Sequence, residues 1–212
     1  MLTVFLTVHN KFAIHVNSGL PLGSFAVEGG PVNASCDIFK IKITGKSSHV
    51  GRPHLGHDAL VTASEVVVAL QTIVAREVNP IDRAVVGIGK LNAGTRYNIV
   101  ANDAEIEGTI RAFNHETRAH LKEAVTRIAK GIAELNRCEF EIDWYDAAAP
   151  VINTPELAEE FQKVVAKVEG IDNLITNYEL SMGADDFADY LVNKPGVYGL
   201  LGSQSGEETA YG

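Results

Sequence analysis

One histidine in the first part of the sequence is placed to bind a metal. His15 closes the apolar run KFAIHV and is followed by the turn-forming residues of NSGLPLG. A histidine that leaves a buried strand in this way can present a ring nitrogen to a metal ion. Taken alone, the pattern favours the alternative, in which His15 is a hydrogen-bonded histidine of the core.

A second group of histidines lies in the polar stretch GKSSHVGRPHLG, which contains His49, His54 and His57. Its glycine, serine and proline residues can bring the backbone close to a ligand. A metal cluster would need an acidic or thiol partner, and the nearest one, Asp58, is better placed to begin the following helix. Two interpretations therefore stay open: ordinary loop histidines, or one functional histidine, His49.

The stretch GTRYNIVANDAEIEGTIRAF combines an amide, Asn98, with a guanidinium, Arg111. Asn98 precedes a predicted strand, and Arg111 lies on the polar side of that strand. A planar guanidinium with an amide beside it can hold a carboxylate through paired hydrogen bonds. The alternative is a surface arginine that pairs with Glu105 or Glu107.

Two adjacent acids, Asp185 and Asp186, occur in SMGADDFADY at the junction between a glycine and a predicted helix. They could face a cation. They could equally begin the helix, because the helix dipole favours a negative charge there, and this second interpretation has a slight lead.

The elements that must position these residues are predicted from the spacing of apolar side chains. Strands are expected at 37–44, 84–91, 104–113 and 138–145, and helices at 58–75 and 116–136. The dry face of the first strand is assigned to Ile38, Phe39, Ile41 and Ile43, and the stripe of the first helix to Leu60, Ala63, Val67, Leu70 and Val74. The order strand, helix, strand, strand, helix, strand is that of the ferredoxin-like split βαβ fold, an α+β arrangement with two helices on one face of an antiparallel sheet.

The segments on either side of residues 36–146 follow a different, α/β pattern. Glu28–Pro31 and Ala147–Pro150 are interpreted as crossings between domains. A helix is expected from residue 155 to about 168, with a capping side chain before its proline, then a strand at 173–176, a helix at 185–192 and a strand at 196–201. The chain is therefore divided into 1–35, 36–146 and 147–212, with the middle part inserted into the outer one. The opening MLTVFLTV is predicted to be a buried strand, and the outer pieces, about 100 residues together, are expected to be too short to close a stable sheet.

The composition fits a globular protein and argues against some partners. Of 212 residues, 46% are hydrophobic and 21% are charged, and the formal net charge of −9 repels phosphate backbones, so no nucleic-acid partner is expected. The apolar opening is too short for a membrane span and no basic segment precedes it, so no membrane or secretory role is expected. The two cysteines, Cys36 and Cys138, share no close spacing, which favours a reduced, cytoplasmic protein.

Five segments in order resemble the M20 family of metallopeptidases and amidohydrolases, and within it the N-acyl-amino-acid and hippurate hydrolases, which include the plant auxin-conjugate hydrolases. The segments are AIHVNSGLPLG, ITGKSSHVGRPHLGHDAL, ALQTIVAREVNP, GTRYNIVANDAEIEGTIRAF and SMGADDFADY, and they cover most of residues 12–202. The resemblance implies a catalytic α/β metallohydrolase domain that holds two divalent metal ions, with a ferredoxin-like lid inserted into it. It also implies a small-molecule N-acyl amino acid or peptide as substrate, and a lid that can pair two copies into a homodimer.

The resemblance assigns roles to individual residues. His15 matches a metal-ligand histidine, and His49 matches the lid histidine that stabilises the oxyanion of the tetrahedral intermediate. Asn98 and Arg111 match residues that hold the carboxylate of the substrate. Asp185 falls in a motif where the family commonly has Glu-Asp, and because the pair here is Asp-Asp its role is left open.

Other parts of the family pattern are missing from the sequence. The family carries metal-binding Cys and His residues and a Glu-Glu pair upstream of His15, and a final ligand histidine after the strand that contains GLLG. The metal site is therefore expected to be incomplete, since catalytic zinc needs about three protein ligands, although zinc, manganese, cobalt and nickel would all suit ligands of these types. The chain is predicted to be a piece of an M20 hydrolase, truncated at both ends and inactive alone. The alternative is a non-catalytic ferredoxin-like module for dimerisation or ligand binding.

Overall fold

The structure, a computed structural model, describes residues 9–205 and divides the chain into two compact units. The inserted unit is Ser35–Ala147. The outer unit combines Met1–Ala34 with Ala148–Gly212. The strand predicted for MLTVFLTV lies outside the described residues.

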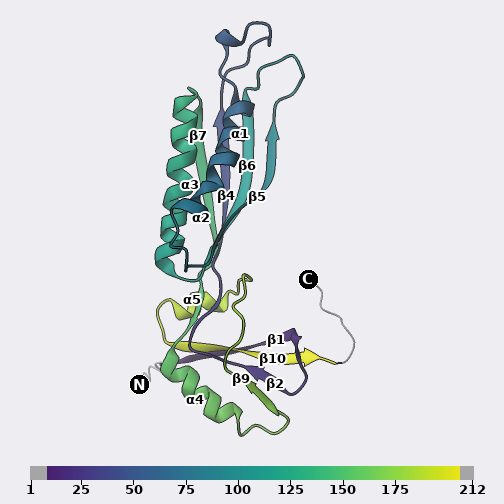
Figure 1. The fold of residues 1–212 in the computed structure, drawn as a ribbon, viewed down its shortest axis with the longest axis vertical. Coiled ribbons are helices and arrows are strands. Elements are labelled where there is room, and N and C mark those ends of the chain that lie inside the picture. The colour runs from purple at the N-terminus through teal and green to yellow at the C-terminus, as the bar shows by residue number, and fades with distance from the viewer. Residues whose placement is uncertain (1–8, 206–212) are drawn as a thin grey trace, which may run out of the picture. The chain divides into compact units, whose positions relative to one another are not determined.

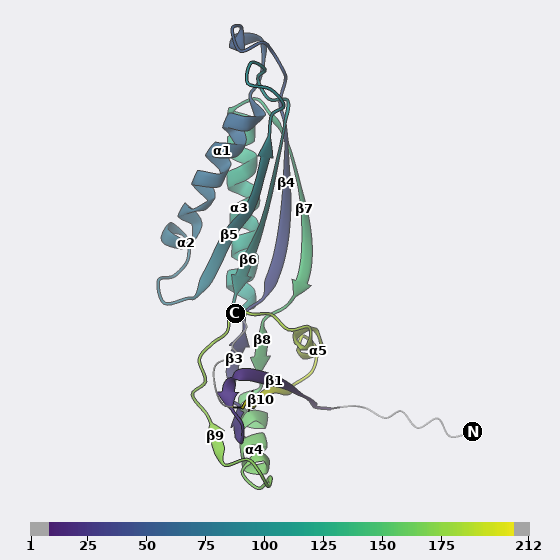
Figure 2. The same ribbon diagram turned by 90° about the vertical axis from the view of Figure 1, so that its right-hand side faces the viewer.

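The inserted unit is a four-stranded sheet with helices on one face (Figures 1 and 2). Its elements are β4 (Cys36–Thr44), α1 (Ala59–Leu70), α2 (Thr72–Arg76), β5 (Ala84–Ala93), β6 (Asp103–Ala112), α3 (His115–Leu135) and β7 (Glu139–Ala148). The strands lie in the order β5-β6-β4-β7, and β6 is antiparallel to both of its neighbours. These elements begin and end within a few residues of the predicted positions, except that the helix expected at 58–75 is two helices separated at Gln71.

Alternation along the strands builds the core of the inserted unit. On β4 the side chains of Phe39, Ile41 and Ile43 are fully buried, whereas Ile38 is 42% exposed. The prediction that Ile38 belongs to the dry face was wrong, because consecutive residues of a strand point to opposite faces of the sheet. Gly108 on β6 lets the ring of Phe39 lie against the backbone, since a Cβ atom at this position would come within 2.3 Å of the ring.

Helix α1 begins at an aspartate cap. The Oδ1 atom of Asp58 accepts hydrogen bonds from the backbone N–H groups of Leu60 at 2.9 Å and Val61 at 3.3 Å, so Asp58 begins the helix as predicted. The apolar stripe differs from the prediction, because Leu60 is 44% exposed. The buried positions of α1 are Ala59, Thr62, Ala63, Val66 and Leu70.

The helical stretch Ala59–Arg76 is long and apolar enough to resemble a membrane span by length and composition, and no other helix within residues 9–205 has these properties. A core helix meets the same criteria. Its residues Val66, Leu70 and Ile73 are fully buried in the core of the inserted unit. Packing inside the unit accounts for these buried positions, whereas Leu60, Val61 and Val68 of α1 stay exposed.

A buried carboxylate ties the first strand of the inserted unit to α3. Asp37 is fully buried, and its two oxygens accept hydrogen bonds from Nε of Arg118 at 2.7 Å and Nη2 of Arg118 at 2.6 Å. Lys122, one helical turn further along α3, lies 3.4 Å from Asp37 and also binds Asp146 near the end of β7. The hydrogen bond to Lys122 is the main cause that lowers the pKa of the Asp146 carboxyl. The cluster joins β4, β7 and α3 by paired charges where the apolar core ends.

The outer unit contains a mixed sheet in the order β1-β10-β2-β9 and a separate two-stranded ladder, β3-β8. Its strands are β1 (Lys11–Pro21), β2 (Ser24–Ala26), β3 (Gly30–Asn33), β8 (Val151–Asn153), β9 (Asn173–Ile175) and β10 (Gly196–Gln204), and its helices are α4 (Pro155–Val165) and α5 (Phe187–Leu191). Strand β1 pairs with β10 in parallel. Strand β1 forms an edge of this sheet.

The face of β1 beside α4 is largely uncovered. Phe12, Ile14 and Val16 are 52%, 59% and 61% exposed, although they alternate as a dry strand face would. The ring of Phe12 contacts Phe161 of α4 at a centroid distance of 5.3 Å, but Phe12 itself stays half exposed. Parallel strands are normally covered on both faces, so the outer unit has an apolar surface that its own described elements leave open.

The start of α4 differs from the prediction in its cap. The helix begins at Pro155, as expected, but the side chain of Thr154 makes no capping hydrogen bond. The Thr154 hydroxyl instead accepts from the backbone N–H of Gly196 at 3.2 Å. Asn153 is also engaged elsewhere, with Tyr198. Thr154 and Asn153 thus form hydrogen bonds with residues of β10 instead of capping α4.

Candidate functional site

His15 lies in a polar hollow of about 300 Å³ in the outer unit. Strand β1 carries His15 opposite Leu200 of the parallel strand β10, and the rings of His15 and Tyr198 are 6.3 Å apart. The hollow is also lined by Asn17, Tyr178 and Asp185. His15 is exposed, so the interpretation of a buried core histidine was wrong.

The carboxylate of Asp185 is occupied by neighbouring donors. Its Oδ1 accepts from the backbone N–H of Phe187 at 2.9 Å, and its Oδ2 accepts from the hydroxyl of Tyr198 at 2.7 Å. Burial and this carboxylate raise the pKa of Tyr198 well above its ordinary value. Asp186 stands before α5 without a side-chain cap bond. Asp185 therefore binds the first turn of the helix, as one alternative predicted, and also lines the hollow, whereas its role toward a cation stays a prediction.

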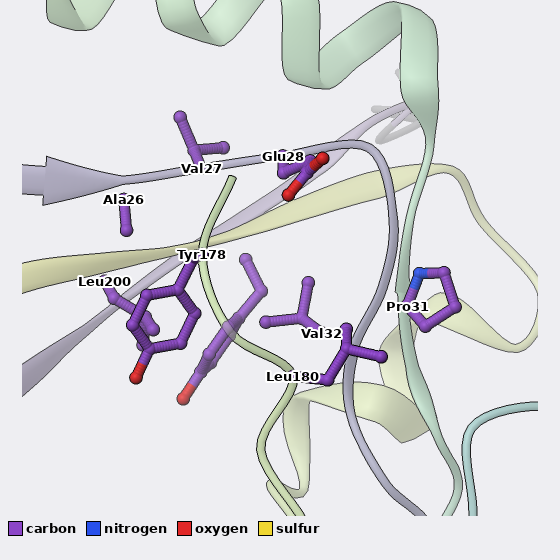
Figure 3. Close-up of a pocket in the computed structure, with 9 residues that line it drawn as sticks. Ala26, Val27, Glu28, Pro31, Val32, Tyr178, Leu180 and Leu200 are labelled. Atoms are coloured by element: carbon purple, nitrogen blue, oxygen red, sulfur yellow. The ribbon is translucent and has the colours of Figure 1, made fainter. Parts of the chain in front are cut away.

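A second, mainly apolar cavity shares Tyr178, Tyr198 and Leu200 with the His15 hollow. Figure 3 shows Tyr178 beside Leu200, with Val32 and Leu180 further along the same wall. The amide of Asn17 donates to the hydroxyl of Tyr178 at 3.0 Å. Tyr178 thus stands between the polar and the apolar spaces with its hydroxyl held on the polar side.

The residues of the hollow do not by themselves make a metal site. Within residues 9–205, no three His, Cys, Asp or Glu side chains lie together in a way that could hold an ion. Only His15 offers an imidazole there, and Asp185 is engaged by two donors. His49, His54 and His57 likewise form no metal cluster with one another.

His49 is held in a tightly closed loop of the inserted unit. The loop is closed by two backbone hydrogen bonds between Lys46 and His57, of 2.8 and 2.9 Å. Glycine is needed at both ends of this loop. A Cβ on Gly45 would lie 2.2 Å from the carbonyl oxygen of His57, and a Cβ on Gly56 would lie 2.6 Å from that of Lys46. The His49 ring is exposed, and its Nδ1 accepts from the N–H of Gly51 at 3.0 Å.

The same loop is bonded to the loop that carries Asn98. The N–H of Val50 donates to the carbonyl of Asn98 at 3.0 Å, and the N–H of Val100 donates to the carbonyl of Ser48 at 2.9 Å. His49 pairs with Ile99 in an isolated bridge. These two hydrogen-bonded loops form one platform that carries both His49 and Asn98. The sequence had not indicated that the two residues lie together.

Arg111 lies elsewhere, on the sheet face opposite the helices. It lines an open hollow of about 620 Å³ together with Cys36, Thr109 and Ile88. Its sequence neighbours on this face, Glu105 and Glu107, both bind Lys90. A further hydrogen bond from Lys40 to Glu105 is the largest of the causes that lower the pKa of the Glu105 carboxyl to about 2.

Asn98 and Arg111 are not brought together within one chain. Arg111 is near the end of β6, whereas the loop of Asn98 precedes the first residue of that strand, Asp103. At about 3.3 Å per residue, the distance from Asp103 to Arg111 along β6 is roughly 26 Å. One carboxylate cannot contact both side chains of a single copy, so the structure contradicts the idea of an amide beside the guanidinium.

Sequence reasoning missed Tyr198 and Tyr178 as parts of the His15 hollow. Their contacts join positions 13 and 161 residues apart, and no local spacing indicates them. Tyr198 was expected only as one residue of a strand. The alternation of β10 could at most have placed it on the same face as Leu200.

Comparison with known proteins gives matches along most of the chain. The family model of a peptidase dimerisation domain matches residues 38–137, inside the inserted unit. An N-acetyldiaminopimelate deacetylase of Priestia megaterium is 37% identical over 92% of this chain and 51% of its own length, and a thermostable carboxypeptidase 2 of Saccharolobus solfataricus is 32% identical over 92% and 49%. A Bacillus subtilis crystal structure, described as a dinuclear metal-binding peptidase from the M20 family, has a TM-score of 0.77 at 30% identity and matches 96% of this chain and 51% of that one. The chain thus spans about half the length of these relatives.

Proposed function

The chain belongs to the M20 family of amidohydrolases and peptidases, and from this premise we propose that its parent protein is a metal-dependent hydrolase that cleaves the amide bond of N-acyl amino acids or small peptides. The observation that carries the proposal is that two hydrogen-bonded loops place His49 and Asn98 on one platform. Such a platform can present hydrogen-bond donors to a carbonyl oxygen as negative charge develops on it. The relatives that support the substrate class are deacetylases of N-acetylated amino acids and a carboxypeptidase.

We propose that the inserted unit is the ferredoxin-like lid of this hydrolase, over residues 36–146, and that residues 1–35 and 147–212 belong to its catalytic domain. The order strand, helix, strand, strand, helix, strand supports the first assignment, together with the sheet order β5-β6-β4-β7. The open face of β1 supports the second, because a catalytic α/β domain would cover Phe12, Ile14 and Val16.

His15 is proposed as one ligand of a divalent metal. Its place in the hollow beside Tyr198 supports this role, and the dinuclear metal centre described for the Bacillus subtilis neighbour supports the presence of a metal in the family. The remaining ligands would come from outside the described residues, since these hold no further ligand set. Bound metal would supply Lewis-acid activation of the scissile carbonyl and of water.

The proposed roles of the lid residues follow from their positions. The exposed ring of His49 would donate a hydrogen bond to the oxygen of the scissile carbonyl, and the half-buried amide of Asn98 would orient the substrate beside it. Arg111 would hold the carboxylate of the amino acid from its hollow on the open face of the sheet. Because Asn98 and Arg111 are far apart in one copy, they would act on different substrate molecules or on one molecule shared between two copies.

A homodimer through the inserted unit would provide such sharing. Strand β5 is an edge of the sheet, and the nearby helix α1 exposes Leu60, Val61 and Val68 to 44%, 47% and 70%. An apolar helix face beside an unpaired strand edge fits a second copy of the same surface. The match of this unit to a peptidase dimerisation domain supports the assignment.

The proposal is tested by kinetics of Arg111→Lys and His49→Ala in the full-length parent. Lysine keeps the charge of Arg111 but loses the planar pair of donors. Loss of charge-assisted hydrogen bonds worth about 1.5–3 kcal/mol should lower kcat/KM on the order of 10- to 150-fold for substrates with a free carboxylate, and much less for their amides. His49→Ala should lower kcat for both substrate types, because the oxyanion forms in either case.

The matched control is Arg137→Lys, the same change at an exposed turn after α3, which should leave both rates unchanged. Equal losses of Arg111→Lys on acid and amide substrates would make Arg111 structural. Absence of any metal-dependent, chelator-sensitive hydrolysis in the parent would instead favour the non-catalytic alternative, a ferredoxin-like dimerisation or ligand-binding module.

A further inference from the structure

We propose that backbone groups fix His15 and His49 in opposite neutral tautomers, with the ring proton of His15 on Nδ1 and that of His49 on Nε2. The consequence for chemistry rests on the hydrolase function proposed above, whereas the tautomers themselves rest only on hydrogen bonds of this chain. The inference makes Gly51 a positioning residue, since it acts through His49.

The partner of His15 is a pure acceptor. Its Nδ1 lies 2.6 Å from the carbonyl oxygen of Val16, and a carbonyl oxygen has no proton to give. Nδ1 must therefore carry the proton. The lone pair of Nε2 is then left available, on a ring that lines the polar hollow beside Tyr198.

The partner of His49 is a pure donor. The N–H of Gly51 points at Nδ1 from 3.0 Å, so Nδ1 must present its lone pair and the proton must be on Nε2. A Cβ at Gly51 would lie 3.1 Å from Nδ1, a tight contact that a small shift of the exposed His49 ring relieves. The turn that delivers the N–H is itself held by the hydrogen bond from Arg52 N–H to the His49 carbonyl, at 2.7 Å.

The two arrangements suit different reactions. A neutral ring with a free Nε2 lone pair can bind a metal ion, and the hydrogen bond at Nδ1 orients it for that purpose. A neutral ring with its proton on Nε2 can donate to a developing oxyanion without first taking up a proton. If His49 were to ligate a metal through Nε2, its proton would have to move to Nδ1, against the N–H of Gly51. His49 can thus donate a hydrogen bond through Nε2, whereas His15 can accept a hydrogen bond or bind a metal ion through Nε2.

The experiment uses the whole 212-residue chain, without metal or substrate, with 15N-labelled histidine. Long-range 1H–15N correlation spectra at about pH 8.5, where imidazole side chains are neutral, distinguish the protonated from the unprotonated ring nitrogen. His15→Asn and His49→Asn variants assign the two rings. His54, an exposed loop histidine, serves as the internal reference for a ring that averages its tautomers.

We expect His15 in the Nδ1–H form, which is the less favoured form of a free neutral histidine, and His49 wholly in the Nε2–H form. Gly51→Pro removes the N–H donor and should move the His49 nitrogens toward the averaged values of His54. Gly51→Ala keeps the N–H and should leave His49 in the Nε2–H form, and a dispersed amide spectrum shows that each variant is folded.

An Nε2–H form at His15, or an averaged ring at His49 in the unsubstituted chain, would overturn the proposal. It would also be overturned if a folded Gly51→Pro variant kept the His49 spectrum unchanged. None of these outcomes depends on turnover. The tautomer assignment can therefore be wrong while the proposed hydrolase function is right, and the function can be wrong while the assignment is right.

Discussion

The two units of the chain differ in how completely they bury their own apolar residues. In the inserted unit, β4 and β6 bury Phe39, Ile41 and Ile106 completely beneath helices of the same unit. In the outer unit, the longest strand, β1, alternates in the same way but leaves Phe12, Ile14 and Val16 more than half exposed. The difference indicates that the inserted unit can be stable by itself, whereas the sheet of the outer unit keeps an apolar face that the elements within residues 9–205 leave open.

The largest effect is expected at the buried charge of the inserted unit. Asp37→Ala leaves the guanidinium of Arg118 and the ammonium of Lys122 without their buried partner, and breaking such a pair costs about 3–5 kcal/mol. Urea unfolding of the purified chain measures the loss. Asp143→Ala, the same change at an exposed site of β7, should shift the free energy of unfolding by less than about 0.5 kcal/mol. Similar values for the two variants would show that the ion cluster does not hold the unit together.

A matched pair of isoleucines compares the two units directly. Ile41→Ala removes a fully buried side chain from β4 and should cost about 2–5 kcal/mol, because it leaves a cavity. Ile14→Ala removes a side chain that is 59% exposed on β1 and should cost well under about 1 kcal/mol. Both are measured by urea unfolding. A large loss at Ile14 in the isolated chain would mean that the outer sheet is covered after all.

Alkaline pH should weaken the outer unit selectively. Burial and the Asp185 carboxylate raise the pKa of Tyr198 above that of an unfolded tyrosine, which is about 10. The stabilisation is therefore fully present below about pH 10 and is lost as the pH rises from there toward the folded pKa. The measurement is the urea midpoint at about pH 8 and pH 10.5, with tyrosinate absorbance followed in parallel. Tyr198→Phe should flatten this pH dependence, and Tyr97→Phe, at a side chain that is 98% exposed, should not.

A substitution on the exposed face of α1 is expected to have the smallest effect on stability. It should nevertheless have a clear effect on dimer formation. Val68→Glu places a charge in the proposed dimer surface at a side chain that is already 70% exposed, so unfolding should change by less than about 0.5 kcal/mol. Sedimentation should nevertheless show a shift from dimer to monomer. Val164→Glu, on the exposed side of α4 in the outer unit, is the matched control and should leave the assembly unchanged. A dimer that survives Val68→Glu would move the interface away from α1.

The order and limits of the elements of the inserted unit could be predicted because they depend on local periodicity, whereas the short strands β2, β3 and β8 of the outer unit were not predicted. Asp58 begins α1 as expected, and the alternation in β4 indicated the buried Phe39, Ile41 and Ile43 but wrongly added the exposed Ile38. The buried ion pair was missed even though a signal was present. Asp37 is in phase with Phe39 on the dry face of its strand, and Arg118 and Lys122 follow one another at helical spacing. A charged side chain whose position in the alternation places it on the buried face of a strand requires a partner of opposite charge there.

The geometry of the candidate site was less predictable, because it depends on pairings between distant segments. The hydrogen bonds that join the His49 loop to the Asn98 loop connect positions about 50 residues apart. The sequence of neither loop predicts that the two loops pair. Spacing in the sequence suggested that Asn98 and Arg111 were close, yet the strand between them holds them apart. The structure therefore redistributes the predicted residues into a platform, an open sheet face and a hollow.

The adjacency of β4 and β7 in one sheet has a consequence for how the chain folds. The outer unit must join strands from both sides of the insertion, such as β3 with β8 and β1 with β10. Closing an unfolded loop of roughly 110 residues would cost about 4 kcal/mol of chain entropy. Once the inserted unit has folded, however, its first and last strands lie side by side, and Lys122 contacts both Asp37 near one end and Asp146 near the other. Early folding of the insertion would thus turn a long-range search in the outer unit into a short-range one.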